Sequence, residues 1–318
     1  MLAIETRQLC KVYGHQRVID DLNMHVPQGS IYGFVGKNGA GKSTVMKMID
    51  HLVRPTSGSI SLFGSDSESE EANRIQRVGS LIESPGLLPD LSAYDNLMGK
   101  ALALGLTDPG DSCQSMLRTV GLEDAKRKRV KKFSLGMKQR LGIALALLGS
   151  PDLLLLDEPF NGLDPEVTRE LRNLIADINR LRGVTVVISS HVLDQLDRIV
   201  TDYGVIAHGH MVAEMSAEQV EQDCGDSLRV KADKPEQALV FLERQFPSLR
   251  FLMEPGGCLR VRGMVPKDQG DVRVDADQVA YALRDQGITV LELSVVKRDI
   301  EDYFVELMEG GAENVQSA

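Results

Sequence analysis

The order of hydrophobic and polar positions in the first 215 residues predicts short strands that are separated by helices. Short apolar runs that end beside glycine or proline indicate strands at Ser30–Gly36, Gly58–Gly64, Leu153–Leu156 and Val184–Ser189. Apolar residues at helical spacing indicate helices at Lys42–Leu52, Ser92–Leu106, Cys113–Gly121 and Pro165–Arg182. Because strands that alternate with helices favour a mostly parallel sheet, we expect an α/β fold for this part of the chain.

The last hundred residues predict a second, smaller domain. Its expected elements follow the order strand, helix, strand, strand, helix, strand, at Leu228–Ala232, Pro235–Phe246, Leu249–Met253, Leu259–Met264, Asp275–Gln286 and Ile288–Val296. This βαββαβ order is the split arrangement of ferredoxin-like α+β domains. A last helix is expected at Arg298–Glu309. We therefore predict one domain over residues 1–215, a small accessory domain over 216–310 and a disordered tail over 311–318.

Composition and charge narrow the class of protein. The 318 residues, 42% hydrophobic and 26% charged, are typical of a folded, water-soluble protein of about two domains. The net charge is −10, and residues from Ser216 onward carry 12 basic and 20 acidic side chains, which supports a boundary there. An acidic chain argues against a protein that coats nucleic acid. We expect no membrane span and no signal peptide, and the four scattered cysteines suggest free thiols in the cytosol.

A phosphate-binding loop is the strongest chemical signal in the chain. Residues 36–44 fit the pattern G-x-x-x-x-G-K-[ST] between a predicted strand and a predicted helix. Glycines allow the backbone to approach a phosphate, the lysine reaches the β- and γ-phosphates, and the serine hydroxyl binds Mg²⁺. The positions that we expect to contact a nucleotide are Gly36, Asn38, Gly39, Ala40, Gly41, Lys42, Ser43 and Thr44.

Two carboxylates, Asp157 and Glu158, directly follow the predicted strand Leu153–Leu156. A carboxylate at the end of a strand near a phosphate loop can support Mg²⁺, and its neighbour can polarise an attacking water. We assign the first role to Asp157 and the second to Glu158.

With these motifs, residues 1–215 resemble the ATP-binding subunits of ABC transporters. Phe133–Arg140 is similar to the family signature, although Leu135 replaces a glycine and Met137-Lys138 precede Gln139. Asn161–Asp164 is similar to the loop that follows the catalytic glutamate. The resemblance implies a P-loop ATPase fold with antiparallel β and helical subdomains.

The resemblance also assigns roles and partners. It implies that His191 senses the γ-phosphate and that Tyr13 stacks on adenine. Ser134, Gly136 and Asp164 would face the ATP of an opposing protomer, so that a homodimer, or a pair with a second ATPase subunit, encloses two ATP molecules. ATP and Mg²⁺ are the expected cofactors. A separate transmembrane permease is the expected partner, at the cytoplasmic face of the membrane, without nucleic acid.

Glu83 occupies a position where the family usually has a glutamine near Mg²⁺. A glutamate there resembles the ATPases that export bacitracin and lantibiotic-type peptides. We therefore expect the chain to energise efflux of an antimicrobial peptide or a drug. The alternatives are a soluble ABC ATPase that acts on ribosomes or DNA, and the ATPase of an importer.

Two features have competing interpretations. Six of the seven residues in 126–132 are basic, which indicates either a nucleic-acid patch or, as we favour, a solvated approach to the signature helix. His208 and His210 flank Gly209, and we favour a turn over a metal site because a metal needs more ligands. The second domain contains no catalytic motif, and the resemblance suggests that it stabilises a dimer.

Overall fold

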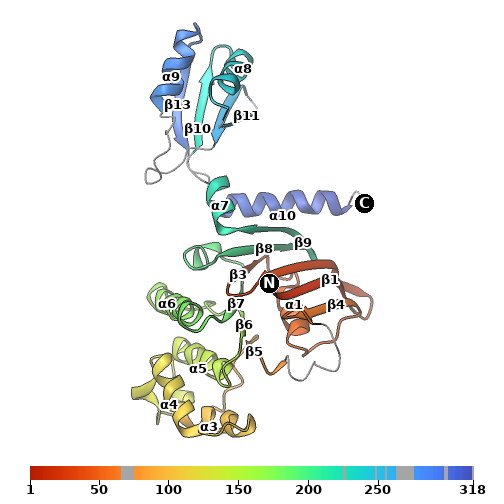
Figure 1. The fold of residues 1–318 in the computed structure, drawn as a ribbon, viewed down its shortest axis with the longest axis vertical. Helices are drawn as coiled ribbons and strands as arrows, with labels where there is room; N and C mark the ends of the chain where they lie inside the picture. Colours follow the sequence, from red (N-terminus) through yellow and green to blue (C-terminus); the bar gives the residue numbers. More distant parts are fainter. Residues whose placement is uncertain are drawn as a thin grey trace. The chain divides into compact units, whose positions relative to one another are not determined.

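The computed structural model describes residues 1–65, 75–224, 227–247, 249–254, 256–262, 276–296 and 300–316 (Figure 1). These residues separate into two units by their internal contacts, one of Met1–Ala217 with Leu307–Ala318 and one of Glu218–Glu306.

A six-stranded sheet forms the centre of the first unit, in the order β5-β6-β7-β3-β8-β9. The bounds are β3 Ile31–Val35, β5 Val78–Leu81, β6 Leu153–Asp157, β7 Thr185–Ser190, β8 Asp202–Ala207 and β9 His210–Ser216. The pairs from β5 to β8 are all parallel, and only β9 is antiparallel to its neighbour. Every residue of β3, β6 and β7 is buried, which explains their continuous apolar sequences. The predicted α/β fold with a mostly parallel sheet is confirmed.

Four of the described helices in this unit overlap the predicted segments, although the helix predicted at Cys113–Gly121 begins four residues earlier, and the sequence predicts α5 without bounds. The helices are α1 Lys42–Ile49, α3 Ala93–Ala103, α4 Pro109–Thr119, α5 Leu135–Leu147 and α6 Pro165–Arg182, with short 3₁₀ turns η2 Glu123–Ala125, η3 Val130–Lys132 and η4 Leu193–Gln195. Helix α6 has the predicted bounds because its signals are local. Asp164 caps its first turn, Pro165 starts it, and Gly183 ends it in a left-handed conformation with φ 67°.

A second, three-stranded antiparallel sheet has the order β2-β1-β4. Its strands are β1 Leu2–Tyr13, β2 Gln16–Pro27 and β4 Ser57–Leu62. Sequence analysis predicted β4 but not the long hairpin of β1 and β2, whose register is interrupted by several irregularities. One apolar cluster joins this sheet to the central sheet and to α1, and it includes Ile4, Leu22, Met24, Phe34, Val45 and Met48.

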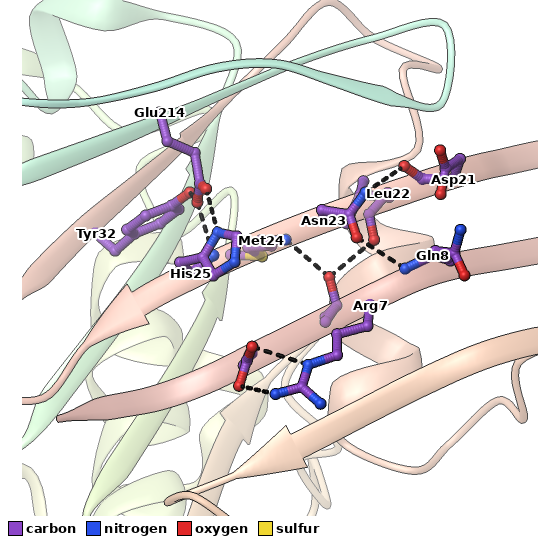
Figure 2. A network of polar contacts seen from close by, with 11 residues as sticks. Arg7, Gln8, Asp21, Leu22, Asn23, Met24, His25, Tyr32 and Glu214 are labelled. Atoms are coloured by element: carbon purple, nitrogen blue, oxygen red, sulfur yellow. Dashed lines mark hydrogen bonds and ion pairs between the residues drawn. The ribbon is translucent and has the colours of Figure 1, made fainter.

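A polar contact between the exposed Glu214 of β9 and the buried Tyr32 also joins the two sheets, and Figure 2 shows it. One carboxylate oxygen accepts hydrogen bonds from the Tyr32 hydroxyl at 2.6 Å and from the His25 backbone N–H at 2.7 Å. The other oxygen lies 2.7 Å from His25 Nδ1. Burial, followed by the charge of Glu214, raises the pKa of Tyr32 well above its usual value, so the hydroxyl remains a neutral donor. Glu214 therefore fixes β2, β3 and β9 together.

The second unit contains a four-stranded antiparallel sheet in the order β11-β12-β10-β13. Its strands are β10 Ser227–Ala232, β11 Arg250–Glu254, β12 Cys258–Arg262 and β13 Val290–Val296. The other helices among the described residues are α7 Ala217–Cys224, α8 Pro235–Gln245, α9 Ala276–Asp285 and α10 Ile300–Gln316. Helices α8 and α9 contribute Ala238, Leu242, Val279 and Leu283 to an apolar core that the sheet completes with Leu228, Val230, Leu259 and Val261.

The end of the chain differs from the prediction. Helix α10 continues to Gln316, so residues 311–316 are helical where sequence analysis expected a disordered tail. The glycine pair Gly310-Gly311 prompted that expectation, because glycine costs up to about 1 kcal/mol per residue in a helix. Ala312 and Glu313, which follow, are good helix formers. Among the described residues, no helix has the length and apolar character needed to cross a membrane.

The contact around Glu214 yields a first prediction. Replacing Glu214 with alanine should lower the free energy of unfolding by about 1–3 kcal/mol, because the buried Tyr32 hydroxyl loses this acceptor. Adding Tyr32→Phe should recover part of the loss, since no hydroxyl then remains to be satisfied. Urea unfolding of both single variants and the double variant measures the coupling. Arg7→Ala, which removes an exposed ion pair with Glu5, is the control. Strictly additive effects would contradict the coupling.

Candidate functional site

The predicted phosphate loop joins the buried end of β3 to the start of α1. Two of its glycines are required by close packing. A Cβ atom at Gly41, where φ is 110°, would lie 2.4 Å from Ile19 Cδ1, and one at Gly36 would lie 2.5 Å from the Ile206 carbonyl oxygen. Between them, Asn38 and Gly39 are exposed at the tip of the loop and Ala40 is buried. The loop is therefore held by β2 and β8 in one shape.

The start of α1 supplies unpaired backbone donors. The Val45 N–H bonds the Gly41 carbonyl at 3.0 Å, which is the first hydrogen bond of the helix. The N–H groups of Lys42, Ser43 and Thr44 precede that bond and have no partner within the helix. Such a helix start favours a bound anion, through these donors and through the helix dipole.

Lys42 carries a charge that is almost fully buried, with 5% of the residue exposed. Its ammonium donates to the Gly36 carbonyl at 2.7 Å and lies 3.3 Å from Glu158 Oε1. A buried charge is stable only where it is paired or hydrogen-bonded. Lys42 is thus held by the backbone of the phosphate loop at Gly36 and by the carboxylate of Glu158, which directly follows β6.

Ser189, at the end of β7, orients both predicted carboxylates. Its hydroxyl donates to Asp157 Oδ1 at 2.6 Å and accepts the Glu158 backbone N–H at 2.9 Å. Sequence analysis missed this residue. The role of Ser189 follows from the sheet register, because Asp157 and Ser189 lie side by side on adjacent parallel strands. That register becomes known only with the fold.

Glu158 lies between Lys42 and His191. Its second oxygen, Oε2, is 2.8 Å from His191 Nδ1, while Oε1 faces Lys42. The backbone of Glu158 is left-handed, with φ 48°, which is uncommon outside glycine and frequent at functional sites. The structure therefore brings together Lys42, Asp157, Glu158 and His191, which sequence analysis had singled out separately.

Tyr13 lies at the turn of the β1–β2 hairpin and is half-exposed. The Lys11 ammonium is 4.8 Å from the centre of its ring. The same hairpin contacts the phosphate loop further along β2, through Ile19 against Gly41. The structure thus places an accessible aromatic ring on the strand pair that packs against the loop.

Ser134, Gly136 and Asp164 form a second group. Ser134 and Asp164 cap α5 and α6, accepting the Met137 N–H at 3.3 Å and the Val167 N–H at 3.0 Å. The two helix starts are close together, because a Cβ atom at Gly136 would lie 2.5 Å from Val167 Cγ1. None of the described hydrogen bonds or ion pairs connects this group to the group around Lys42.

Glu83 follows β5 with a left-handed backbone, φ 63°, and its mostly exposed carboxylate forms an ion pair with Lys47 of α1. Nearby, the Ser80 hydroxyl donates to Asp50, at the end of α1, at 2.8 Å. Burial raises the pKa of Asp50. The segment around Glu83 is therefore attached to the helix that starts at the phosphate loop, and Lys47 is a partner that sequence analysis did not identify.

A groove of about 250 Å³ lies beside the Glu83 segment. It is lined by residues that follow Glu83 and by the start of α5: Ser84, Pro85, Leu87, Pro89, Val130, Leu135, Lys138 and Gln139. The groove therefore joins the segment that contacts α1 to the helix that Ser134 caps.

The oxygen ligands near the phosphate loop suit Mg²⁺ only when a bound phosphate supplies further ligands. No group of three or more His, Cys, Asp or Glu side chains suited to a metal occurs among the described residues. Ser43 and the buried Asp157 can supply two oxygens, and Mg²⁺ in nucleotide sites usually takes one or two protein ligands with phosphates and water.

His208 and His210 lie at the turn between β8 and β9, where His210 is 3.9 Å from Asp20, in agreement with the turn that we favoured.

Comparisons with known proteins show the family of the chain. A family profile described as ABC transporter matches residues 19–161. The chain is 38% identical over 308 residues to the bacitracin transport ATP-binding protein BcrA of Bacillus licheniformis, covering 97% of this chain and 98% of that protein. It is 42% identical over 211 residues to the lantibiotic transport ATP-binding protein SrtF of Streptococcus pyogenes, covering 66% and 90%.

Solved structures show the same fold. An ATP-binding subunit of an ABC transporter aligns with a TM-score of 0.62 at 29% identity, over 71% of this chain and 94% of that one. The dimeric post-hydrolysis structure of the ATP-binding cassette MJ0796 with ADP and phosphate aligns with a TM-score of 0.61 at 22% identity, over 67% and 98%. With a phosphate loop, paired carboxylates and a histidine in contact, and a full-length relative at 38% identity, the chain belongs to the ATP-binding, ATP-hydrolysing subunits of ABC transporters.

Proposed function

We propose that this chain energises the efflux of an antimicrobial peptide or a related drug through a separate membrane permease, at the cytoplasmic face of the membrane. The observation that carries the proposal is similarity to a bacitracin transport protein over 97% of the chain, accessory unit included. The glutamate at position 83 supports it. Neither an importer nor an ATPase of ribosomes or DNA is favoured by these relatives.

The residues around Lys42 would perform the hydrolysis. Mg²⁺, held by Ser43 and Asp157, would neutralise phosphate charge. Lys42 would exchange its contact with Glu158 for the β- and γ-phosphates, while the N–H groups at the start of α1 bind phosphate oxygens. Glu158, released from Lys42, would orient and polarise a water, and His191 would stabilise the γ-phosphate. Tyr13 would stack on adenine.

The second group, Ser134, Gly136 and Asp164, would complete the site of another protomer. In a single chain it has no described bond to the group around Lys42, although its helix start also favours an anion. Two chains, or one chain and a second ATPase subunit, would therefore enclose two ATP molecules. Hydrolysis would then require the dimer.

Glu83 would connect the nucleotide to the permease. Its carboxylate forms an ion pair with Lys47 of α1, and the residues that directly follow it, Ser84 and Pro85, line the groove. Any shift of α1 on nucleotide binding would reach the groove through this ion pair. We expect the permease to contact the chain there.

The Glu158→Gln variant tests the catalytic assignment. It keeps the size of the side chain but removes the negative charge that polarises water, so ATP binding should persist while turnover falls by at least about 100-fold. A dimer that is stable with ATP should accumulate. The measurements are ATPase rate, nucleotide affinity and light scattering with ATP. Near-normal turnover would remove Glu158 from this role.

The Gly136→Ala variant tests whether Gly136 acts through packing or through the partner's nucleotide. The added methyl would meet Val167 Cγ1, so we expect a loss of about 1–3 kcal/mol in stability and of ATP-dependent dimerisation. Val167→Ala in the same chain should restore both if packing is the cause. Restored stability without restored dimerisation would indicate that the glycine itself faces the nucleotide. An unchanged Gly136→Ala protein would contradict both roles.

The Glu83→Ala and Lys47→Ala variants test the link to the permease. Both should bind ATP normally, yet both should lose most protection against peptide antibiotics in cells that also express the permease. Arg180→Ala, which removes an exposed ion pair with Asp177 on α6, is the matched control and should protect fully. Full protection by both test variants, against a peptide that the wild type exports, would exclude the proposed link.

A further inference from the structure

The side chain of Tyr13 lies at the exposed end of the β1–β2 hairpin. Strand β1 ends at Tyr13, which pairs with Gln16 across the turn, and 46% of Tyr13 is exposed. The neighbouring Val12 donates its backbone N–H to the Thr56 hydroxyl at 3.0 Å, which holds the strand but not the ring. An exposed side chain keeps its rotamer freedom until another group restrains it. The orientation of the ring therefore depends on what contacts it.

The ammonium group of Lys11 covers one face of this ring. It lies 4.8 Å from the ring centre, within the range of a cation–π attraction. Lys11 precedes Tyr13 by two positions in β1, the spacing at which side chains share one face of a strand. Because the ammonium occupies one face, an aromatic ligand can stack only on the other face.

Lys11 is itself anchored outside the hairpin. Its ammonium donates a hydrogen bond to the Arg54 carbonyl at 2.7 Å. Arg54 lies in the segment after α1, and the preceding Val53 donates its N–H to the Lys47 carbonyl of α1 at 3.1 Å. The ammonium therefore connects the ring to the segment that follows the helix of the phosphate loop.

We propose that Lys11 is a positioning residue for the nucleotide, because its ammonium, held by the Arg54 carbonyl, fixes the Tyr13 ring relative to the phosphate loop. This role rests on the proposed function, in which Tyr13 stacks on adenine. Lys11 acts through the ring and contacts neither the base nor the phosphates. It adds to the proposed site a residue whose effect is confined to the base.

Two physical effects favour base binding when the ammonium is in place. A ring that is already restrained loses less conformational freedom when a base stacks on it. A cation also draws electron density toward its own face of the ring, which makes the opposite face less negative and better suited to an electron-rich purine. Both effects raise the affinity for the adenosine part of a nucleotide. A lysine that merely attracts anions would instead raise the affinity for the phosphate part as well.

Binding of ADP and of pyrophosphate to the full-length chain, both with Mg²⁺, tests the proposal. Both ligands carry a diphosphate, but only ADP carries a base, and neither has a γ-phosphate to be hydrolysed. Lys11→Met keeps an unbranched side chain and removes the ammonium. In isothermal titration calorimetry its affinity for ADP should fall by about twofold to fivefold, the range of an exposed cation–π contact. Its affinity for pyrophosphate should not change.

Two further variants serve as controls. Lys11→Arg keeps a cation that can lie over the ring and donate to the Arg54 carbonyl, so it should bind ADP as the wild type does. Arg7→Met removes a positive charge from the same strand, where Arg7 forms an exposed ion pair with Glu5, and should also bind ADP normally. A loss in Arg7→Met as large as that in Lys11→Met would assign the effect to charge alone and overturn the proposal. Urea unfolding shows that each variant is folded at the temperature of the titration.

The double variant shows whether Lys11 acts through the ring. Tyr13→Ala alone should weaken ADP binding by at least about fivefold, because stacking on the base is lost. Adding Lys11→Met to Tyr13→Ala should then cause no further loss.

Three results would overturn the role of Lys11 while leaving the stacking by Tyr13 intact. They are an unchanged affinity of Lys11→Met for ADP, an equal loss for ADP and pyrophosphate, and an equal loss with and without the ring. Normal ADP binding by Tyr13→Ala would instead contradict the stacking assignment of the proposed function, and the role of Lys11 with it.

Discussion

The buried ammonium group of Lys42 is the constraint on which the rest of the site depends. A charge with so little contact to water must be surrounded by acceptors. The structure meets this requirement with the Gly36 carbonyl and the Glu158 carboxylate. That is achieved only because parallel β3, β6 and β7 end at the same edge of the sheet, so that a loop and two strand ends converge. The apolar sequences of these strands thus determine the position of the charges that follow them.

Sequence analysis predicted the parts of the site that depend on local signals. The phosphate loop, the carboxylates after β6 and the proline-started helix α6 each consist of neighbouring residues with a fixed chemical or conformational role. Ser189 and Lys47 could not be predicted in the same way, because their partners, Asp157 and Glu83, are more than 30 residues distant in the chain. Their roles become visible only with the strand register and with the packing of α1 against the segment after β5.

The same distinction applies to the fold. Central strands were predictable because burial on both faces makes them continuously apolar. The β1–β2 hairpin was not, because its exposed positions and register irregularities weaken the alternation that identifies a strand. Ser134 and Asp164 show a further limit, since each is both a helix cap in this chain and a predicted contact to another. A capping signal in the sequence explains the first role completely and therefore cannot reveal the second.

The hydroxyl of Ser189 has a consequence for the energetics of ligand binding. The hydroxyl donates its single hydrogen bond to Asp157, and one of its lone pairs accepts a hydrogen bond from the Glu158 N–H. Ser189 also lies two residues before His191 on the same strand end. Under the proposed function, a cation bound at Asp157 and an anion that engages His191 would act on one hydrogen-bonded unit, which runs from Asp157 through Ser189 and Glu158 to His191. Their binding free energies would then be coupled, and the coupling would be reciprocal. A metal ion bound at Asp157 would then change the affinity for a phosphate at His191 by the same factor by which that phosphate changes the affinity for the metal ion.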